Sequence, residues 1–240
     1  MENKDQTELS IFLCGVGGQG VTSFGQMLAE ILVKSPLIKD LVSTESRGVS
    51  QREGMVYFSL RALLTSQAPG KSSKPPSAPS DEEPLKPQQS EKKIYEDKNP
   101  ISLEASSLTP KPQEGQANIY IGLEPLEFFR NIRYLHPTGL AILNTSPIIP
   151  KNTILSGDAE YPQIEKLVKK FLTKFPEIEF ISKNFSEIGE TQYRNAFYGN
   201  LHIVNYLHQK FAQFFPKKHI RAVIEKYPRI STAWDELNKE

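Results

Sequence analysis

The sequence has very little cysteine and no long apolar run. Cys14 is the only cysteine among 240 residues, which excludes a disulfide framework, a CxxC redox pair, a zinc ribbon and an iron–sulfur cluster held by this chain alone. No stretch approaches the roughly 18 consecutive apolar residues of a membrane span, and the mean hydropathy is -0.43. The segment from Met1 to Ser10 is polar where a signal peptide needs an apolar stretch. These absences predict a reduced, soluble, cytoplasmic protein.

An excess of one charge sign is also missing. The 29 basic residues nearly balance 28 acidic ones, for a net charge of +1. Global charge therefore gives no reason to expect nucleic acid or an anionic membrane as a partner. The four histidines show no metal-ligand spacing, so we expect no metal site.

One long segment has too few apolar residues to build a core. Residues 65–116 hold nine of the eighteen prolines and nine serines. Such a composition cannot bury enough apolar surface to offset the entropy of ordering. We therefore predict a low-complexity insertion at 65–99, acting as a disordered loop or tether. The whole chain, 1–240, is predicted to be a single domain that carries this insertion.

Strand-like and helix-like patterns alternate outside this insertion. The predicted strands are Leu9–Cys14, Asp40–Thr44, Met55–Arg61, Asn118–Gly122, Leu140–Asn144 and Glu179–Ser182. The predicted helices are Val21–Val33, Pro125–Leu135, Gln163–Phe175 and, as the longest, Gln192–Phe215. This alternation predicts an α/β fold, specifically a three-layer Rossmann-like sandwich around a largely parallel sheet.

A glycine-rich loop, GVGGQG at 15–20, separates the first predicted strand from the first predicted helix. Glycines let a backbone approach a ligand closely, and a helix N-terminus offers free N–H groups to an anion. The loop also matches the GxGxxG pattern of dinucleotide sites, which expects an acidic residue about 20 positions later. Asp40 or Glu45 could fill that position. A dinucleotide site, another anion site and simple helix–strand packing remain open on this loop alone.

A second polar loop follows the second predicted strand. The segment Thr44–Val56 reads TESRGVSQREGMV, and it should lie at the same carboxyl edge of the sheet as the glycine loop. Arg47 and Arg52 could meet a phosphate or carboxylate bidentately, with Glu45 and Gln51 fixing the loop geometry. The alternative is a solvated connection without a ligand.

These two loops together resemble the gamma-domain family of 2-oxoacid:ferredoxin oxidoreductases. The second loop is similar to the family pattern E-x-x-G-x-x-Q-R-G-G. Two further segments, GLEPLE at 122–127 and YLHPTG at 134–139 ending in Asn144-Thr145, are similar to the family's GFEPLE and YLxPGGxxxxNT segments. The C-terminal region with Asn195, Gly199 and Asn200 is similar too. The resemblance covers 9–64 and about 100–235, and it is nearest to the beta subunits of the indolepyruvate branch.

The resemblance implies a non-cofactor subunit of an oxidoreductase. The family reaction oxidatively decarboxylates a 2-oxoacid, here an aryl pyruvate such as indolepyruvate, to an acyl-CoA and reduces ferredoxin. Thiamine diphosphate, Mg²⁺ and iron–sulfur clusters would then lie in a large alpha subunit, with coenzyme A as co-substrate. This chain shows no thiamine motif, because Gly157-Asp158 continues with alanine rather than the glycine of the GDG magnesium motif. We expect no catalytic residue here and no activity from the isolated chain.

The resemblance also implies which residues meet the co-substrate. The expected cofactor-binding residues are Gly15, Gly17, Gly18, Gln19, Gly20, Glu45, Arg47, Gln51, Arg52 and Asn144. Their loops would hold coenzyme A, or they would dock onto the alpha subunit. The alternative functions are a gamma subunit specific for pyruvate or 2-oxoglutarate, a stand-alone Rossmann protein binding NAD(P) or FAD, and a scaffold without an enzyme partner.

Overall fold

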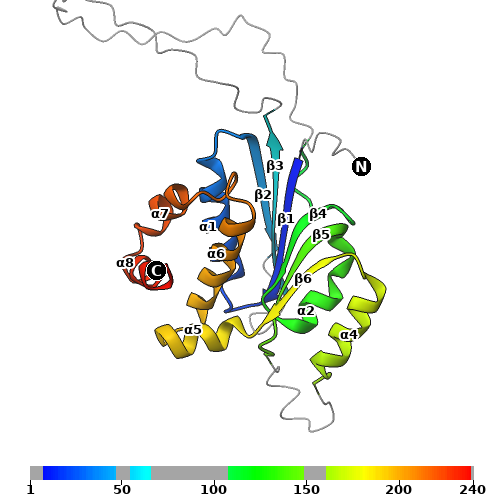
Figure 1. The fold of residues 1–240 in the computed structure, drawn as a ribbon. Helices are drawn as coiled ribbons and strands as arrows, with labels where there is room; N and C mark the ends of the chain where they lie inside the picture. Colours follow the sequence, from blue (N-terminus) through cyan, green and yellow to red (C-terminus); the bar gives the residue numbers. More distant parts are fainter. Residues whose placement is uncertain (1–7, 47–54, 66–107, 149–160, 239–240) are drawn as a thin grey trace, which may run out of the picture. The chain divides into compact units, whose positions relative to one another are not determined.

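The computed structural model describes residues 8–46, 55–65, 108–148 and 161–238 (Figure 1). All of them belong to one compact unit, made of Met1–Ser66 and Leu108–Glu240. The predicted insertion at 65–99 lies outside the described residues, except for Thr65, and so does the second unit, Gln67–Ser107.

A six-stranded sheet in the order β2-β3-β1-β4-β5-β6 organises this unit. The strands are β1 (Glu8–Val16), β2 (Ile38–Ser46), β3 (Met55–Leu64), β4 (Ala117–Gly122), β5 (Leu135–Asn144) and β6 (Glu179–Lys183). The neighbours β1, β4, β5 and β6 pair in parallel. Strand β3 pairs antiparallel with both β1 and β2, so it alone runs against the other five. The predicted α/β fold with a largely parallel sheet is confirmed.

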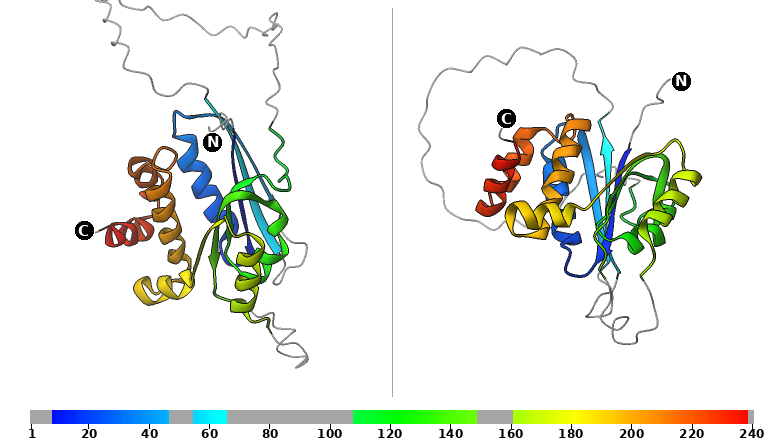
Figure 2. Two further views of the ribbon diagram at one scale, coloured as in Figure 1. Left: turned by 45° about the vertical axis from the view of Figure 1, so that its right-hand side comes forward. Right: turned by 60° about the horizontal axis from the view of Figure 1, so that its bottom comes forward.

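Helices cover both faces of the sheet, as Figures 1 and 2 show. One face carries α1 (Val21–Val33), α5 (Phe185–Tyr193), the 3₁₀ turn η2 (Ala196–Gly199), α6 (Asn200–Lys210), α7 (Lys217–Ile224) and α8 (Pro228–Leu237). The other face carries α2 (Pro125–Arg130), the 3₁₀ turn η1 (Ile132–Tyr134) and α4 (Ile164–Lys174). This is the predicted three-layer arrangement. In the described part of the chain, no helix has the length and apolar character to cross a membrane.

Strand β1 is buried on both faces, which explains why its sequence is apolar without alternation. Ile11 and Leu13 belong to the core on the α1 side, whereas Phe12 and Cys14 belong to the core on the α2 side. All four side chains are at most 1% exposed. A strand buried on both faces needs apolar residues at every position, which is why LSIFLC reads as a continuous run.

Two predicted helices differ from the structure: one is interrupted and the other is shorter. The helix predicted for Gln192–Phe215 is wrong as one continuous element, because α5 ends at Tyr193 and α6 begins only at Asn200. Arg194 adopts a left-handed conformation (φ 54) between them, and Asn195 accepts a hydrogen bond from the N–H of Phe197. Pro125–Leu135 is likewise shorter. Here Asn131 donates from Nδ2 to the carbonyl of Glu127 at 2.8 Å, which closes the last turn of α2.

The strand registers place two connections at opposite edges of the sheet. Ser46 and Cys14 both align with Tyr57, so β2 ends and β3 begins at the edge where β1 meets the glycine loop. At the other edge, β3 ends at Leu64, and the chain is next described from residue 108. The buried side chain of Arg61 links two segments at this second edge. Its guanidinium forms an ion pair with Glu8 at 2.6 Å and donates to the carbonyl of Thr109 at 3.1 Å.

Candidate functional site

The glycine loop is fastened to the neighbouring strand by the side chain of Gln19. Gln19 Oε1 accepts from the N–H of Val16 at 2.9 Å, and Nε2 donates to the carbonyl oxygen of Leu123 at 2.7 Å. Leu123 directly follows β4, and its own N–H donates to the carbonyl of Cys14. The loop between β1 and α1 is therefore held in a defined position at the carboxyl edge of the sheet.

The glycines of the loop divide into two groups with different roles. A Cβ on Gly15 would lie 2.6 Å from Gln19 Oε1, and a Cβ on Gly20 would lie 2.6 Å from the ring of Phe197. These two positions need glycine for packing, and Gly20 also has a positive φ of 76. A Cβ on Gly17 or Gly18 would meet nothing within 4 Å. Both are exposed, so the loop tip is open to a ligand.

The side chain of Asn144, at the end of β5, donates a hydrogen bond to the same backbone oxygen, that of Leu123. Its Nδ2 donates to the carbonyl of Leu123 at 3.0 Å and to Ser186 Oγ at 2.8 Å, while its Oδ1 accepts from the N–H of Ser186 at 3.3 Å. Asn144 is only 3% exposed. This side chain thus links the ends of β4 and β5 to the first turn of α5.

A cavity of about 400 Å³ opens beside these groups. We call it the glycine-loop cavity. It is lined by Gly18, Gln19, Leu123, Asn144, Ser146, Ile148, Ser186, Asn195, Ala196, Phe197 and Asn200. The cavity lies outside the carboxyl ends of β1, β4 and β5 and beside the N-terminus of α1. Open α/β sheets bind their ligands at this position.

The structure brings together six of the ten predicted site residues. Gly18, Gln19 and Asn144 line the cavity, and Gly15, Gly17 and Gly20 belong to the same loop. Three more, Arg47, Gln51 and Arg52, lie outside the described residues. The flanking residues Ser46 and Met55 both lie at the carboxyl edge, as the sequence predicted for this connection.

Glu45 lies farther from the glycine loop than the dinucleotide pattern expects. Its strand, β2, is separated from β1 by the antiparallel strand β3. Two strand spacings put it about 10 Å across the sheet from β1. The other candidate, Asp40, aligns with Leu63, as does Glu8, so it lies near the opposite edge. This topology argues against a dinucleotide site of the usual kind at this loop.

Sequence reasoning did not assign Ser186, Asn195, Phe197 or Asn200 to the site. Ser186 lies in the first turn of α5, while Asn195, Phe197 and Asn200 come from the turn and helix that follow it. The family resemblance around Asn195, Gly199 and Asn200 was the one available signal. No local pattern indicates that this distant segment returns to the glycine loop.

Beside the cavity, a buried carboxylate orders the start of α2. Glu124, which is 1% exposed, accepts from the N–H of Glu127 at 2.8 Å and from the hydroxyl of Tyr161. Burial, followed by this hydrogen bond to Glu124, raises the pKa of Tyr161 well above its usual range. Tyr161 therefore stays protonated and continues to donate at neutral pH.

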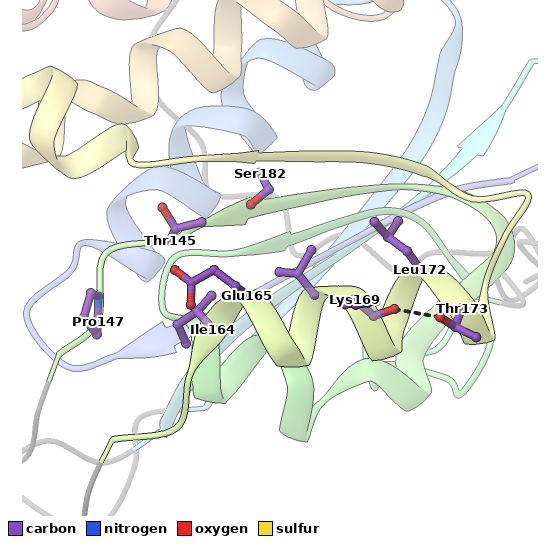
Figure 3. A pocket seen from close by; sticks show the side chains of 9 residues that line it. Thr145, Pro147, Ile164, Glu165, Lys169, Leu172, Thr173 and Ser182 are labelled. Carbon is purple, nitrogen blue, oxygen red and sulfur yellow. Dashed lines mark hydrogen bonds between the residues drawn. The ribbon is translucent and has the colours of Figure 1, made fainter.

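A second cavity lies along α4, with a volume of about 760 Å³. Figure 3 shows its walls from α4, β6 and the segment after β5. Its lining residues are Thr145, Pro147, Ile164, Glu165, Val168, Lys169, Leu172, Thr173 and Ser182. Thr145 and Pro147 face this cavity, whereas Asn144, Ser146 and Ile148 face the glycine-loop cavity, so one extended segment separates the two. No predicted site residue lines it.

Two kinds of reactive site are disfavoured in the described part of the chain. No group of three or more His, Cys, Asp or Glu residues is placed to hold a metal ion there. Cys14 is fully buried and lies 3.6 Å from the hydroxyl of Tyr120. Burial raises the pKa of its thiol far above the usual range. In this environment Cys14 is a small core residue rather than a reactive thiol.

No family model matches the chain. Among curated proteins, it is 26% identical over 218 residues to indolepyruvate oxidoreductase subunit IorB of Archaeoglobus fulgidus, covering 91% of this chain and 85% of that protein. This relative bears out the family resemblance seen in the sequence motifs.

Two solved structures share the fold. One is a 2-oxoglutarate:ferredoxin oxidoreductase from Magnetococcus marinus with 2-oxoglutarate, coenzyme A and succinyl-CoA bound, at a TM-score of 0.55 and 12% identity; the match covers 97% of this chain and 30% of that chain. The other is pyruvate oxidoreductase subunit PORC from Thermotoga maritima, at a TM-score of 0.52 and 12% identity, covering 95% of this chain and 91% of that chain.

Proposed function

We propose that this chain is the non-cofactor, gamma-type subunit of a 2-oxoacid:ferredoxin oxidoreductase, most specifically one that acts on indolepyruvate or another aryl pyruvate. The relative that supports this assignment is similar over 91% of the chain and is named as an indolepyruvate oxidoreductase subunit. In this proposal the whole chain, 1–240, is one gamma-type domain that carries the insertion at 65–99.

The structural observation that carries the proposal is the construction of the glycine-loop cavity. Gln19 and Asn144, from two separate elements, both donate to Leu123 O and shape a cavity at the carboxyl edge of the sheet. The exposed tip at Gly17 and Gly18 leaves backbone open beside it. This arrangement suits the binding of a ligand or a partner rather than chemistry by side chains, because the described lining holds no histidine, cysteine or charged side chain that could act as a base or activate a serine hydroxyl.

The proposed division of labour follows from what the chain contains. A large alpha subunit would carry thiamine diphosphate, Mg²⁺ and iron–sulfur clusters, which supply the decarboxylation and electron-transfer chemistry. This subunit would bind coenzyme A at the edge of the complex where the glycine loop lies. Arg47 and Arg52 would add positive charge for its phosphates, with Glu45 and Gln51 supporting the loop. The competing role for the same loops is docking onto the alpha subunit.

The test of this function begins with the native protein. Affinity purification from its source should recover a large second chain, and the eluate should contain bound thiamine diphosphate and iron. A panel of 2-oxoacids, assayed with coenzyme A and ferredoxin, should then show the highest kcat/KM for an aryl pyruvate. Preference for pyruvate or 2-oxoglutarate would move the protein to another branch. Recovery of the chain alone, without thiamine or iron, would contradict the proposal.

A further inference from the structure

The described lining of the glycine-loop cavity contains no acidic or basic side chain. Its polar groups are carboxamides and hydroxyls: Gln19, Asn144, Ser146, Ser186, Asn195 and Asn200. A phosphate buried among such groups would lack a cationic partner, and burying an unpaired charge is costly. The cavity interior is therefore suited to an uncharged polar group.

Several of these side chains are already engaged in holding the site together. Gln19 uses both ends of its amide, on Val16 N and Leu123 O. Asn144 uses its amide on Leu123 and Ser186. They shape the wall of the cavity, and neither amide is left without a partner.

Asn200 differs from them. It is only 6% exposed and lines the cavity, yet its side chain makes no hydrogen bond with any part of the chain that the structure describes. A carboxamide has two N–H donors and a carbonyl acceptor. The amide atoms of Asn200 are not among the fully buried side-chain atoms that lack a partner, so they open onto the cavity. Their hydrogen-bonding capacity is thus available to a ligand in the cavity.

The backbone around Asn200 is fixed independently of any ligand. A Cβ on Gly199 would lie 1.9 Å from the carbonyl oxygen of Phe185, and a Cβ on Gly189 would lie 2.4 Å from the N–H nitrogen of Gly199. Only glycines allow this approach of η2 to α5. The N–H of Asn200 also donates back into η2. The amide is thus held on a rigid junction, as a recognition group requires.

We propose that the glycine-loop cavity recognises an uncharged amide group through the side chain of Asn200, and that charged groups of the ligand stay outside it. An amide offers one donor and one acceptor, which complement the acceptor and donors of the asparagine. This inference rests on the proposed function when it names the ligand. In coenzyme A the pantetheine arm carries uncharged amides, whereas the nucleotide end carries the phosphates. The arm would enter the cavity, and the phosphates would stay at the open tip of the glycine loop.

The experiment uses the native protein with its co-purifying chains and two fragments of coenzyme A as probes. Pantetheine contains the amides without phosphate, and adenosine 3′,5′-bisphosphate contains phosphates without the amides. Calorimetric titration would measure both probes and coenzyme A against the wild type and Asn200→Ala. Asn205→Ala is a matched control, because Asn205 lies on the same helix but lines a different cavity. Asn200→Asp, which keeps the side-chain size and removes the N–H donors, serves if the alanine variant fails to fold.

The expected result is a roughly tenfold weaker affinity for pantetheine and for coenzyme A in both Asn200 variants. Affinity for the bisphosphate and all affinities of the Asn205→Ala control should stay within twofold. The inference would be overturned if the Asn200 substitutions left the affinity for pantetheine unchanged, or if they weakened only the affinity for the bisphosphate. It would also be overturned if pantetheine did not bind at all. If pantetheine binds through Asn200 while coenzyme A does not bind, the amide site stands and the proposed coenzyme A role falls. If coenzyme A binds equally well to the wild type and to the Asn200 variants, the proposed coenzyme A role stands and the amide site falls.

Discussion

Gln19 and Asn144 donate to the same backbone oxygen, that of Leu123, at 2.7 and 3.0 Å. One side chain comes from the glycine loop and the other from the end of β5. The shared acceptor means that three segments meeting at the carboxyl edge depend on one another.

This shared acceptor predicts that the two side chains are energetically coupled. Either amide alone can satisfy Leu123 O, so Gln19→Ala and Asn144→Ala together should cost more than the sum of the single changes, by about 1 kcal/mol. Urea unfolding of the four proteins in a double-mutant cycle measures the coupling. Gln209→Ala, at an exposed position of α6, is the control and should be neutral. Strict additivity would mean that the two hydrogen bonds act independently.

The glycines of the loop offer a matched pair of substitutions. Gly20→Ala introduces a Cβ against the ring of Phe197 at a positive φ, so it should destabilise the fold by about 1–3 kcal/mol. Gly17→Ala places its Cβ in open space and should leave the unfolding midpoint almost unchanged. Any loss of ligand or partner binding by Gly17→Ala would then report function rather than folding. Equal destabilisation by both would contradict the division into packing and open glycines.

Part of this site follows from sequence and part does not. Gly15 to Gly20 lie between a strand that is buried on both faces and an amphipathic helix, and both patterns are local, so the loop could be placed correctly. The position of β3 between β1 and β2 depends on pairing between strands, which no single segment encodes. Similarly, Asn200 lies beyond a break that the apolar pattern of 192–215 does not reveal. Asn200 lines the same cavity as Gly18 and Gln19 only because the tertiary fold brings two distant segments together.

Arg61 should be a determinant of stability at the edge opposite the site. It is 6% exposed and joins Glu8 to Thr109, one residue beyond where the described chain resumes. Arg61→Ala should cost roughly 2–4 kcal/mol, since it leaves the Glu8 carboxylate and the Thr109 carbonyl without this partner. Because these contacts hold the edge together, replacing 66–107 by a short glycine–serine linker should leave the unfolding free energy within about 1 kcal/mol. Denaturant unfolding checks both, and a large loss from the deletion alone would show that the insertion supports the fold.

Cys14 should be chemically silent in the native protein. Its raised thiol pKa, caused first by burial, keeps the group protonated at pH 7 to 9. Labelling by iodoacetamide should therefore follow unfolding, with a rate that rises with urea and changes little with pH in the folded state. Mass spectrometry of native and unfolded protein measures this difference. Rapid native labelling that increases with pH would indicate an accessible thiolate.

The arginines of the second loop separate the two proposed roles of the site. Arg52→Ala should weaken coenzyme A binding about tenfold if Arg52 meets a phosphate, because a charged hydrogen bond contributes roughly 1.5–3 kcal/mol. It should instead weaken recovery of the alpha subunit if the loop docks onto that partner. Arg221→Ala is the control, since Arg221 pairs with Glu225 and Asp235 on the helices at the outer side of the molecule. Titration of coenzyme A and quantitative pull-down, run on the same preparations, assign the role, and no effect in either assay would remove Arg52 from the site.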